Sequence, residues 1–375
     1  MKRYIFILAA FAITLASCSK IYDATPVNTD PTPIGFGAWT EVLTKAARVP
    51  GTSTFTASGY QENDLAVYGY KHRASGAPTD VTVFDDVVVS TTNGTTWTYS
   101  PKRFWDTGYD SYIFYAVSPA AVGTEGTVDP QTGEITSASI TFAGNNNDIL
   151  VADKKTVLKT DTPVNFGNGS VAYGAVNLVF NHIASLVDLK VKKSTDLNDA
   201  TVAVTAIALE NINKVNNFTV SDAYTSTHPV VNWNNGFTAS GSNTGTYSNT
   251  GENKGVNDVA TLPANVTSDA AGDFLINNLV AMPQTFRSAG DYIQRVKISY
   301  TVTVAGSGTN TYTDITIPLH TFDGTNDTDN TADFKSEWEA GKHITYYITI
   351  NARAIEFTAS ISDWGSDSGY HYLVN

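Results

Sequence analysis

Cysteine is almost absent from this chain, which has one, Cys18, among 375 residues. A single cysteine cannot form an intrachain disulfide, so the fold does not rest on a disulfide framework. Basic residues are also few, with 23 lysines and arginines against 36 aspartates and glutamates and no basic cluster along the sequence. Nucleic-acid binding needs a dense positive surface, and the sequence therefore argues against a nucleic-acid partner.

Enzyme motifs are missing as well. The chain has no G-x-S-x-G, no H-E-x-x-H and no glycine-rich phosphate loop before a helix. His182 lies in an apolar segment without a nucleophile nearby, so we expect a hydrogen-bonded histidine beside a core. Asp85 and Asp86 are neighbours on an expected strand and should point to opposite faces. The sequence predicts no enzyme activity, and it assigns no cofactor and no metal.

One acidic loop leaves a question open. Residues 323–333 read D-G-T-N-D-T-D-N-T-A-D and could chelate calcium. The loop lacks the glycine and the terminal glutamate of a calcium-binding loop at the required offsets. An ordinary acidic loop is the alternative.

What the chain does have favours β-structure. Thr, Ser, Asn and Gly are abundant, charged residues make up only 16%, and the apolar content of 42% suffices for proper cores. The length indicates two domains, which we place at residues 34–194 and 195–375. One short helix is expected near the C-terminus, with Asn330 or Thr331 as its cap, Phe334 and Trp338 on one face, and Gly341 after its end.

The amino terminus indicates export. Lys2 and Arg3 precede the apolar run 4–15, as in a signal peptide, which we assign to residues 1–17. The sequence L-A-S-C ending at Cys18 resembles the bacterial lipobox, which implies that Cys18 is lipidated. Residues 18–33 contain three prolines and no apolar periodicity, so they should form an extended tether. We expect a lipid-anchored protein at the outer membrane or cell surface.

Strand signals fill the rest of the chain. The clearest alternation runs from Tyr292 to Val304, with Ile315, Ile317 and Leu319 as its expected partner strand. The segment Trp97–Pro119 is the densest in aromatic residues, and its part from Tyr112 to Val117 is apolar on both faces, which predicts a strand buried on both sides.

Several segments carry a family resemblance. The first is the set Trp97, Tyr99, Pro101, Phe104, Trp105, Phe114, Ala116 and Pro119. Four more follow in order: 148–152 (DILVA), 176–187 (VNLVFNHIASLV), 207–211 (IALEN) with 274–284 (FLINNLVAMPQ), and 338–350 (WEAGKHITYYITI) with 361–364 (ISDW). Together these segments resemble the fimbrillins of Bacteroidetes, the Mfa-like pilus subunits.

The resemblance implies a fold and a role. It implies two tandem β-sandwich domains of a transthyretin-like arrangement in a pilus subunit that mediates adhesion to a host or bacterial surface. It also implies a trypsin-like processing protease that cuts between Arg48 and Val49 and removes the first strand; an ordinary loop arginine is the alternative. The unpaired neighbours of that strand could then accept an extended segment of another subunit. In the tail, the donor side chains would be Tyr370, Tyr372 and Val374, unless the tail completes its own sheet.

A second function stays open on the sequence alone. A surface lipoprotein that never polymerises could bind glycans through exposed aromatic rings. Such a protein should show a platform of solvent-facing rings among Trp39, Trp97, Trp105 and Trp233. A detachable first strand beside an exposed Arg48 favours the pilus subunit instead.

Overall fold

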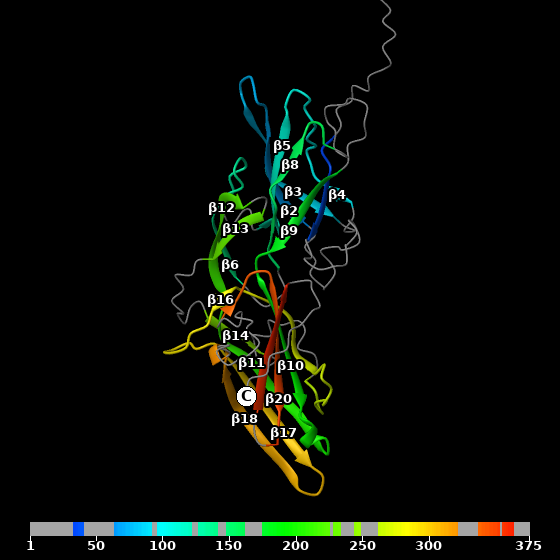
Figure 1. Cartoon of the computed structure of the whole chain (residues 1–375), viewed down its shortest axis with the longest axis vertical. Coiled ribbons are helices and arrows are strands. Elements are labelled where there is room, and N and C mark those ends of the chain that lie inside the picture. Colours follow the sequence, from blue (N-terminus) through cyan, green and yellow to red (C-terminus); the bar gives the residue numbers. More distant parts are fainter. Residues whose placement is uncertain are drawn as a thin grey trace, which may run out of the picture.

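The computed structural model describes residues 33–40, 64–91, 96–121, 127–141, 148–161, 175–225, 228–233, 244–248, 262–321, 337–352 and 355–363. Within these ranges the chain is all-β, as expected, with 21 strands and two short 3-10 helices, η1 (Thr195–Leu197) and η2 (Leu319–Thr321). Figure 1 shows an elongated molecule, with β2, β3, β5 and β9 towards one end and β10, β17, β18 and β20 towards the other. We call these the upper and lower halves.

The upper half is built on one eight-stranded sheet. Its order is β1-β9-β7-β5-β2-β3-β4, with β8 paired to β5. The strands are β1 (Phe36–Thr40), β2 (Asp64–His72), β3 (Asp80–Thr91), β4 (Trp97–Thr98), β5 (Ser111–Ser118), β7 (Leu150–Ala152), β8 (Lys155–Leu158) and β9 (Val176–His182). Every pair is antiparallel except β1 with β9, which is parallel. All residues of β5 are buried, which confirms the prediction for this strand.

The lower half contains two four-stranded sheets. One has the order β15-β10-β20-β21 and the other β14-β11-β17-β18. The strands are β10 (Ser185–Lys193), β11 (Ala200–Asn213), β14 (Thr244–Ser248), β15 (Asp273–Ala281), β17 (Arg295–Val304), β18 (Gly308–Pro318), β20 (Lys342–Ile350) and β21 (Ile355–Asp363). Side chains from both sheets, such as Leu189 of β10 and Ile298 of β17, belong to one buried cluster, so the sheets pack face to face.

Two smaller sheets complete the structure. The order β13-β12-β6 joins β6 (Ile135–Thr141) to β12 (Val215–Thr225) and β13 (His228–Trp233), and β16 (Gln284–Thr285) pairs with β19 (Glu337–Trp338). The three-stranded sheet covers the outer face of the upper sheet, because Phe218 and Trp233 share a buried cluster with Ile113 and Tyr115. Strands from distant parts of the chain thus build one layer.

The strands of the lower half follow their sequence pattern closely. In β17, Val296, Ile298 and Val302 are buried and belong to the lower core, as the alternation predicts. The pairing with β18 shifts register between Ile298 and Tyr300, and Ser299 is buried at this irregularity. Period two therefore identified the strand but not its bulge.

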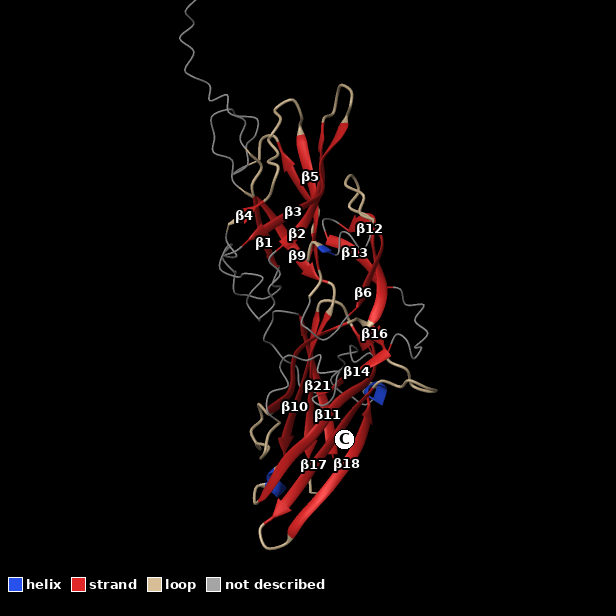
Figure 2. Ribbon diagram, turned by 180° about the vertical axis from the view of Figure 1, so that it is seen from behind, coloured by secondary structure: helices blue, strands red, loops and turns tan. Residues whose placement is uncertain are grey.

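The expected C-terminal helix is wrong in the part that can be checked. Trp338 lies in β19, where it pairs with Gln284, while residues 330–336 fall outside the described ranges. The indole ring packs edge-on against Phe286, and its N–H donates to Tyr346 Oη at 2.9 Å. Gly341 has the positive φ of +71° expected of a cap glycine, but it sits in a turn before β20. Figure 2 shows strands throughout both halves and only small helical segments.

Candidate functional site

None of the residues singled out for processing lies in the described part of the chain. Cys18, Arg48 and Val49 fall outside it, as do the tail residues Tyr370, Tyr372 and Val374 and the acidic loop 323–333. Their roles stay predictions. The structure does describe the first strand, whose removal the sequence resemblance implies, and the surroundings of that strand.

Strand β1 is the edge strand of the upper sheet, next to β9. It pairs in parallel with β9, from Phe36 opposite Val176 to Thr40 opposite Phe180. On its other side, Ile34 N–H donates to Arg103 O at 2.8 Å, and Pro33 forms an isolated bridge with Phe104. The first strand therefore lies between β9 and the segment 99–104 that follows β4.

The side chains of this first segment enter an aromatic core. Phe36 is buried and meets three rings edge-on, with centroid distances of 5.3 Å to Phe84, 5.8 Å to Tyr99 and 5.7 Å to Phe114. Ile34 is buried in the same cluster. Tyr99 and Phe114 both belong to the aromatic motif of Trp97–Pro119. The motif residues therefore form much of the surface on which β1 rests, which the sequence reading did not anticipate.

The segment that faces β9 across β1 is held in place by hydrogen bonds. Tyr99 Oη donates to Ile34 O at 2.8 Å and accepts from Arg103 N–H at 3.2 Å. Burial raises the pKa of Tyr99, and the Arg103 hydrogen bond offsets part of the rise, so the phenol stays a donor at neutral pH. The Arg103 guanidinium donates to Val83 O at 3.1 Å. Two hydrogen bonds in all join the segment 99–104 to Ile34, while the bonds from Arg103 to Tyr99 and Val83 do not involve the first strand segment.

A second set of contacts supports the loop between β4 and β5. Trp105 lies 4.7 Å from Tyr112, centroid to centroid, in an edge-on arrangement. Tyr112 Oη accepts the backbone N–H of Asp106 at 2.8 Å, and Asp106 in turn forms an ion pair with Lys71 at 2.6 Å. That hydrogen bond from Lys71 holds the pKa of Asp106 below its usual value. These contacts fix the loop between β4 and β5 independently of β1.

The residues that invite a catalytic interpretation have structural contacts. His182 Nδ1 lies 2.5 Å from Asp148 Oδ2, and Asp148 Oδ1 accepts Ile149 N–H at 2.8 Å. Asp85 and Asp86 are both exposed within β3, where Asp86 has a positive φ of 49° and accepts the hydroxyl of Tyr68. They mark an irregularity inside the strand, and both are exposed instead of lying on opposite faces. Across the described ranges no three metal-ligating side chains cluster.

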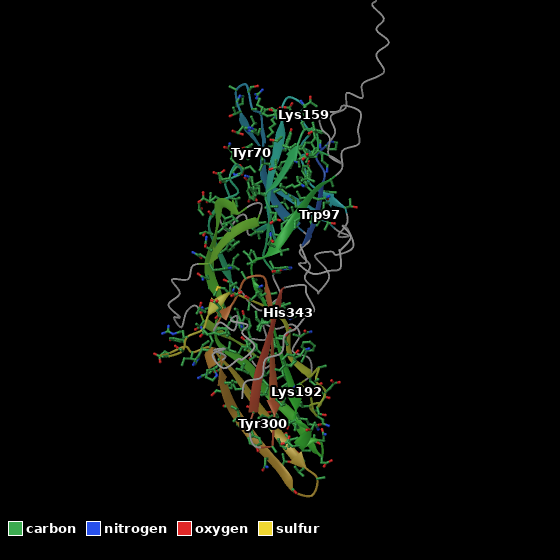
Figure 3. The ribbon with its side chains drawn as sticks, viewed as in Figure 1. Tyr70, Trp97, Lys159, Lys192, Tyr300 and His343 are labelled. Carbon is green, nitrogen blue, oxygen red and sulfur yellow. The ribbon has the colours of Figure 1, made fainter. Side chains whose placement is uncertain are left out.

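The candidate platform tryptophans whose side chains are described do not form an exposed platform. Trp97, Trp105 and Trp233 are all buried, with 7 to 9% of each residue exposed. Trp97 lies in the upper half of the molecule (Figure 3), and the side chain of Trp39 is not among those described. The glycan-binding alternative therefore lacks the feature that would favour it.

Comparisons with known proteins identify the family. A profile of the fimbrillin-like family matches residues 48–364, most of the chain. The chain belongs to the fimbrillin-like family. It is thus a fimbrillin-like protein, from a family that is not enzymatic. A search of curated proteins finds no significant match, and no helix in the described ranges is long and apolar enough to cross a membrane.

One solved structure shares the overall fold, and others are weaker matches. A fimbrial protein from Bacteroides vulgatus is 17% identical, with a TM-score of 0.51 over 88% of this chain and 99% of that one. The tip fimbrial protein Mfa3 from Porphyromonas gingivalis, truncated at its C-terminus, is 11% identical, with a TM-score of 0.38 over 80% of this chain and 94% of that one. The first of these comparisons supports the overall fold of the fimbrillin-like chain.

Proposed function

We propose that this chain is a subunit of a cell-surface fimbrium and that it assembles by strand exchange. A protease cuts after Arg48, the segment before Val49 leaves with β1, and an extended segment from another subunit takes its place. The observation that carries the proposal is the position of β1, an edge strand whose Phe36, together with Ile34 just before the strand, packs into a core otherwise built by other segments.

The physical driving force follows from the contacts of β1. Its loss would leave the edge of β9 with unpaired backbone groups and would expose Phe84, Tyr99 and Phe114 to water. An incoming strand restores both the hydrogen bonds and the apolar burial, which is the general basis of strand addition. A strand that repeats the native geometry runs parallel to β9 and carries apolar side chains at alternate positions.

The tail of the chain has such a pattern. Tyr370, Tyr372 and Val374 alternate along the sequence, two residues apart, and the preceding strand β21 ends at Asp363. We propose that residues 364–375 of one subunit replace β1 of the next. Cys18 supplies the lipid that carries the precursor to the outer membrane, and adhesion to a host or bacterial surface is the function of the assembled fimbrium.

The architecture of the subunit is part of the proposal. We propose two tandem β-sandwiches, as the sequence predicts. The pairing of β10 with β15 and β20 favours placing the first crossing between the sandwiches at Ile183 and Ala184, instead of after residue 194, with β12 and β13 returning to the upper one.

Limited trypsin digestion tests the processing step. The protein is produced from residue 19 onward, digested briefly, and analysed by mass spectrometry and by sizing. We expect a cut after Arg48, loss of the β1 segment, and ladders of oligomers. Trypsin also cuts after lysine, and Lys45 lies three residues before Arg48. The double variant Lys45→Ala with Arg48→Ala should therefore prevent both the loss of β1 and the ladders, while Arg287→Ala, at an arginine in a different loop, should leave both unchanged.

A peptide experiment tests the donor segment. A labelled peptide of residues 364–375 should bind the trimmed protein and not the intact one, because β1 fills the site in the intact chain. A peptide with Tyr370→Asp and Tyr372→Asp should not bind, since a charge in the apolar site costs several kcal/mol. A trimmed protein that stays monomeric and does not bind the peptide would refute strand exchange by this segment.

A further inference from the structure

The two halves of the molecule meet at a very short connector. Strand β9 ends at His182 and β10 begins at Ser185, so only Ile183 and Ala184 join the upper sheet to the lower one along this path. Short exposed linkers normally let domains move relative to each other. This connector is buried, since both Ile183 and Ala184 are at most 2% exposed.

The connector is bonded to elements on both sides. From the upper half, Ile183 N–H donates to Ile149 O at 3.1 Å, and Ile183 O accepts the indole N–H of Trp233 in β13 at 3.0 Å. From the lower half, Ala184 O accepts Gly341 N–H at 2.7 Å, and Ser185 Oγ donates to Glu339 O at 2.7 Å. A rotation about the connector would break bonds on either side and leave buried polar groups unpaired, which is costly.

The apolar core also continues across the connector. One buried cluster contains Leu186 of β10 and Met282, which follows β15. The same cluster contains Tyr68 of β2 and both Phe218 and Trp233 of the three-stranded sheet, whose rings lie 5.2 Å apart. Bending the molecule at this level would expose part of the cluster to water.

A second chain crossing lies beside the first. Strand β11 pairs with β17 in the lower half, and after Lys214 the chain continues as β12, which pairs with β6. Lys214 Nζ donates to Thr246 O at 2.8 Å and lies 3.9 Å from the centre of the Tyr247 ring. Asn213 N–H donates to the side-chain oxygen of Gln284 at 3.1 Å. Two separate crossings with fixed positions oppose both bending and twisting.

We propose that these contacts hold the two halves together as one rigid body. The two main contacts to the connector are the hydrogen bonds donated by the N–H groups of Trp233 and Gly341. Figure 1 shows the connector level near the middle of the long axis, between β9 and β10. The chain then behaves as a stiff rod, and a pull on β9 passes directly into β10 and its parallel neighbour β20. This proposal does not depend on strand exchange.

Distance measurements on the intact chain test whether the two halves form one rigid body. Cys18 is removed, and dyes are attached through Val88→Cys in β3 and Phe274→Cys in β15, both at exposed positions. Single-molecule energy transfer should show one narrow distance distribution. Combining Trp233→Phe, which removes the indole N–H, with Gly341→Ala should broaden it. A Cβ at Gly341 would lie 3.1 Å from His182 O, and φ there is +71°.

A matched control separates the loss of contacts at the connector from the effect of backbone strain alone. Gly306→Ala imposes a similar backbone strain at φ +79° in the turn after β17, but its Cβ meets no atom within 4 Å. This variant should keep the narrow distribution. A broad distribution in the unmodified protein would overturn the proposal, as would an unchanged distribution in the double variant when circular dichroism shows that it is folded. Neither outcome bears on processing at Arg48.

Discussion

Phe36 is the largest side chain that β1 is seen to contribute to the upper core. Truncating it removes three ring contacts and leaves a cavity between Phe84, Tyr99 and Phe114. We expect Phe36→Ala to destabilise the intact chain by about 3 to 5 kcal/mol, the usual cost of such a truncation in a core. Urea denaturation followed by tryptophan fluorescence measures the change, because Trp97 and Trp105 lie in the same cluster.

Val88 provides the comparison for this variant. It lies on β3 of the same sheet but is 49% exposed, so Val88→Ala should change stability by no more than about 0.5 kcal/mol. If Phe36→Ala cost as little as Val88→Ala, β1 would not be packed as described. In protein already trimmed after Arg48, the Phe36 substitution is absent and the difference should disappear.

Glu210 allows a prediction on pH. Burial alone would raise its pKa, but hydrogen bonds from Lys297 and Arg295 outweigh this, and its pKa is lowered below the ordinary value. Lys297 Nζ and Arg295 Nε lie 2.5 and 2.7 Å from its two oxygens. A lowered folded-state pKa gives stability that is present above the ordinary glutamate value and is lost as pH falls through the folded value.

The Glu210→Gln variant should therefore lose stability at neutral pH, by roughly 1 kcal/mol for a partly exposed network. Its stability should also fall less steeply than that of the parent chain when pH is lowered below the ordinary glutamate value. Denaturant midpoints at a series of pH values measure both effects. Parallel curves for the two proteins would show that this ion-pair network contributes nothing to the acid dependence.

Among the elements, β2 depends on a close approach to β5. A Cβ at Gly69 would lie 2.4 Å from the backbone oxygen of Ile113, which cannot yield without moving β5. We expect Gly69→Ala to destabilise the upper half by about 1 to 3 kcal/mol or more, since the clash is with backbone. Gly35→Ala is the control, because its Cβ would meet only Ala175 at 3.9 Å. Thermal melts of the two variants should differ clearly, and equal melts would contradict the close packing of β2 on β5.

The sequence predicts elements that depend on local pattern. Alternation identified β17, and the doubly apolar run identified β5, because side-chain direction along a strand has a fixed period of two. Trp338 was misassigned to a helix because a spacing of four with Phe334 satisfies a helix equally well. Its burial against Phe286 and its pairing with Gln284 are tertiary contacts, and local sequence carries no record of them.

Contacts between residues distant in sequence could not be predicted, for the same reason. The motif around Tyr99 and Phe114 was recognised by resemblance, yet its packing on Phe36 depends on a pairing of β1 with β9 about 140 residues away. The split of residues 176–187 into β9 and β10, in different sheets, also depends on distant partners. The residues proposed for cleavage, lipidation and donation are outside the described ranges, so they stay predictions.

At the scale of the whole molecule, the upper half is not made of contiguous sequence. Strand β6 pairs with β12, which comes after residue 195, and Phe218, Val220 and Trp233 complete the cluster on the outer face of the upper sheet. A fragment of residues 34–194 would therefore lack one layer of its core. It would also contain β10 without β15 and β20, the two strands that flank it.

We therefore expect residues 34–194 not to fold as an independent unit, although their length is ordinary for a domain. Hydrogen exchange provides a sharp measurement, because the amides of β6 (Ile135–Thr141) should be protected in the full chain and exchange freely in the fragment. Amides of β2 and β5 report whether the upper sheet forms at all in the fragment, since the pairings of β2 with β3 and β5 lie within it. Protection of β6 in a soluble fragment that unfolds cooperatively would contradict this prediction, because it would show that β12 and β13 are dispensable for folding of the upper half.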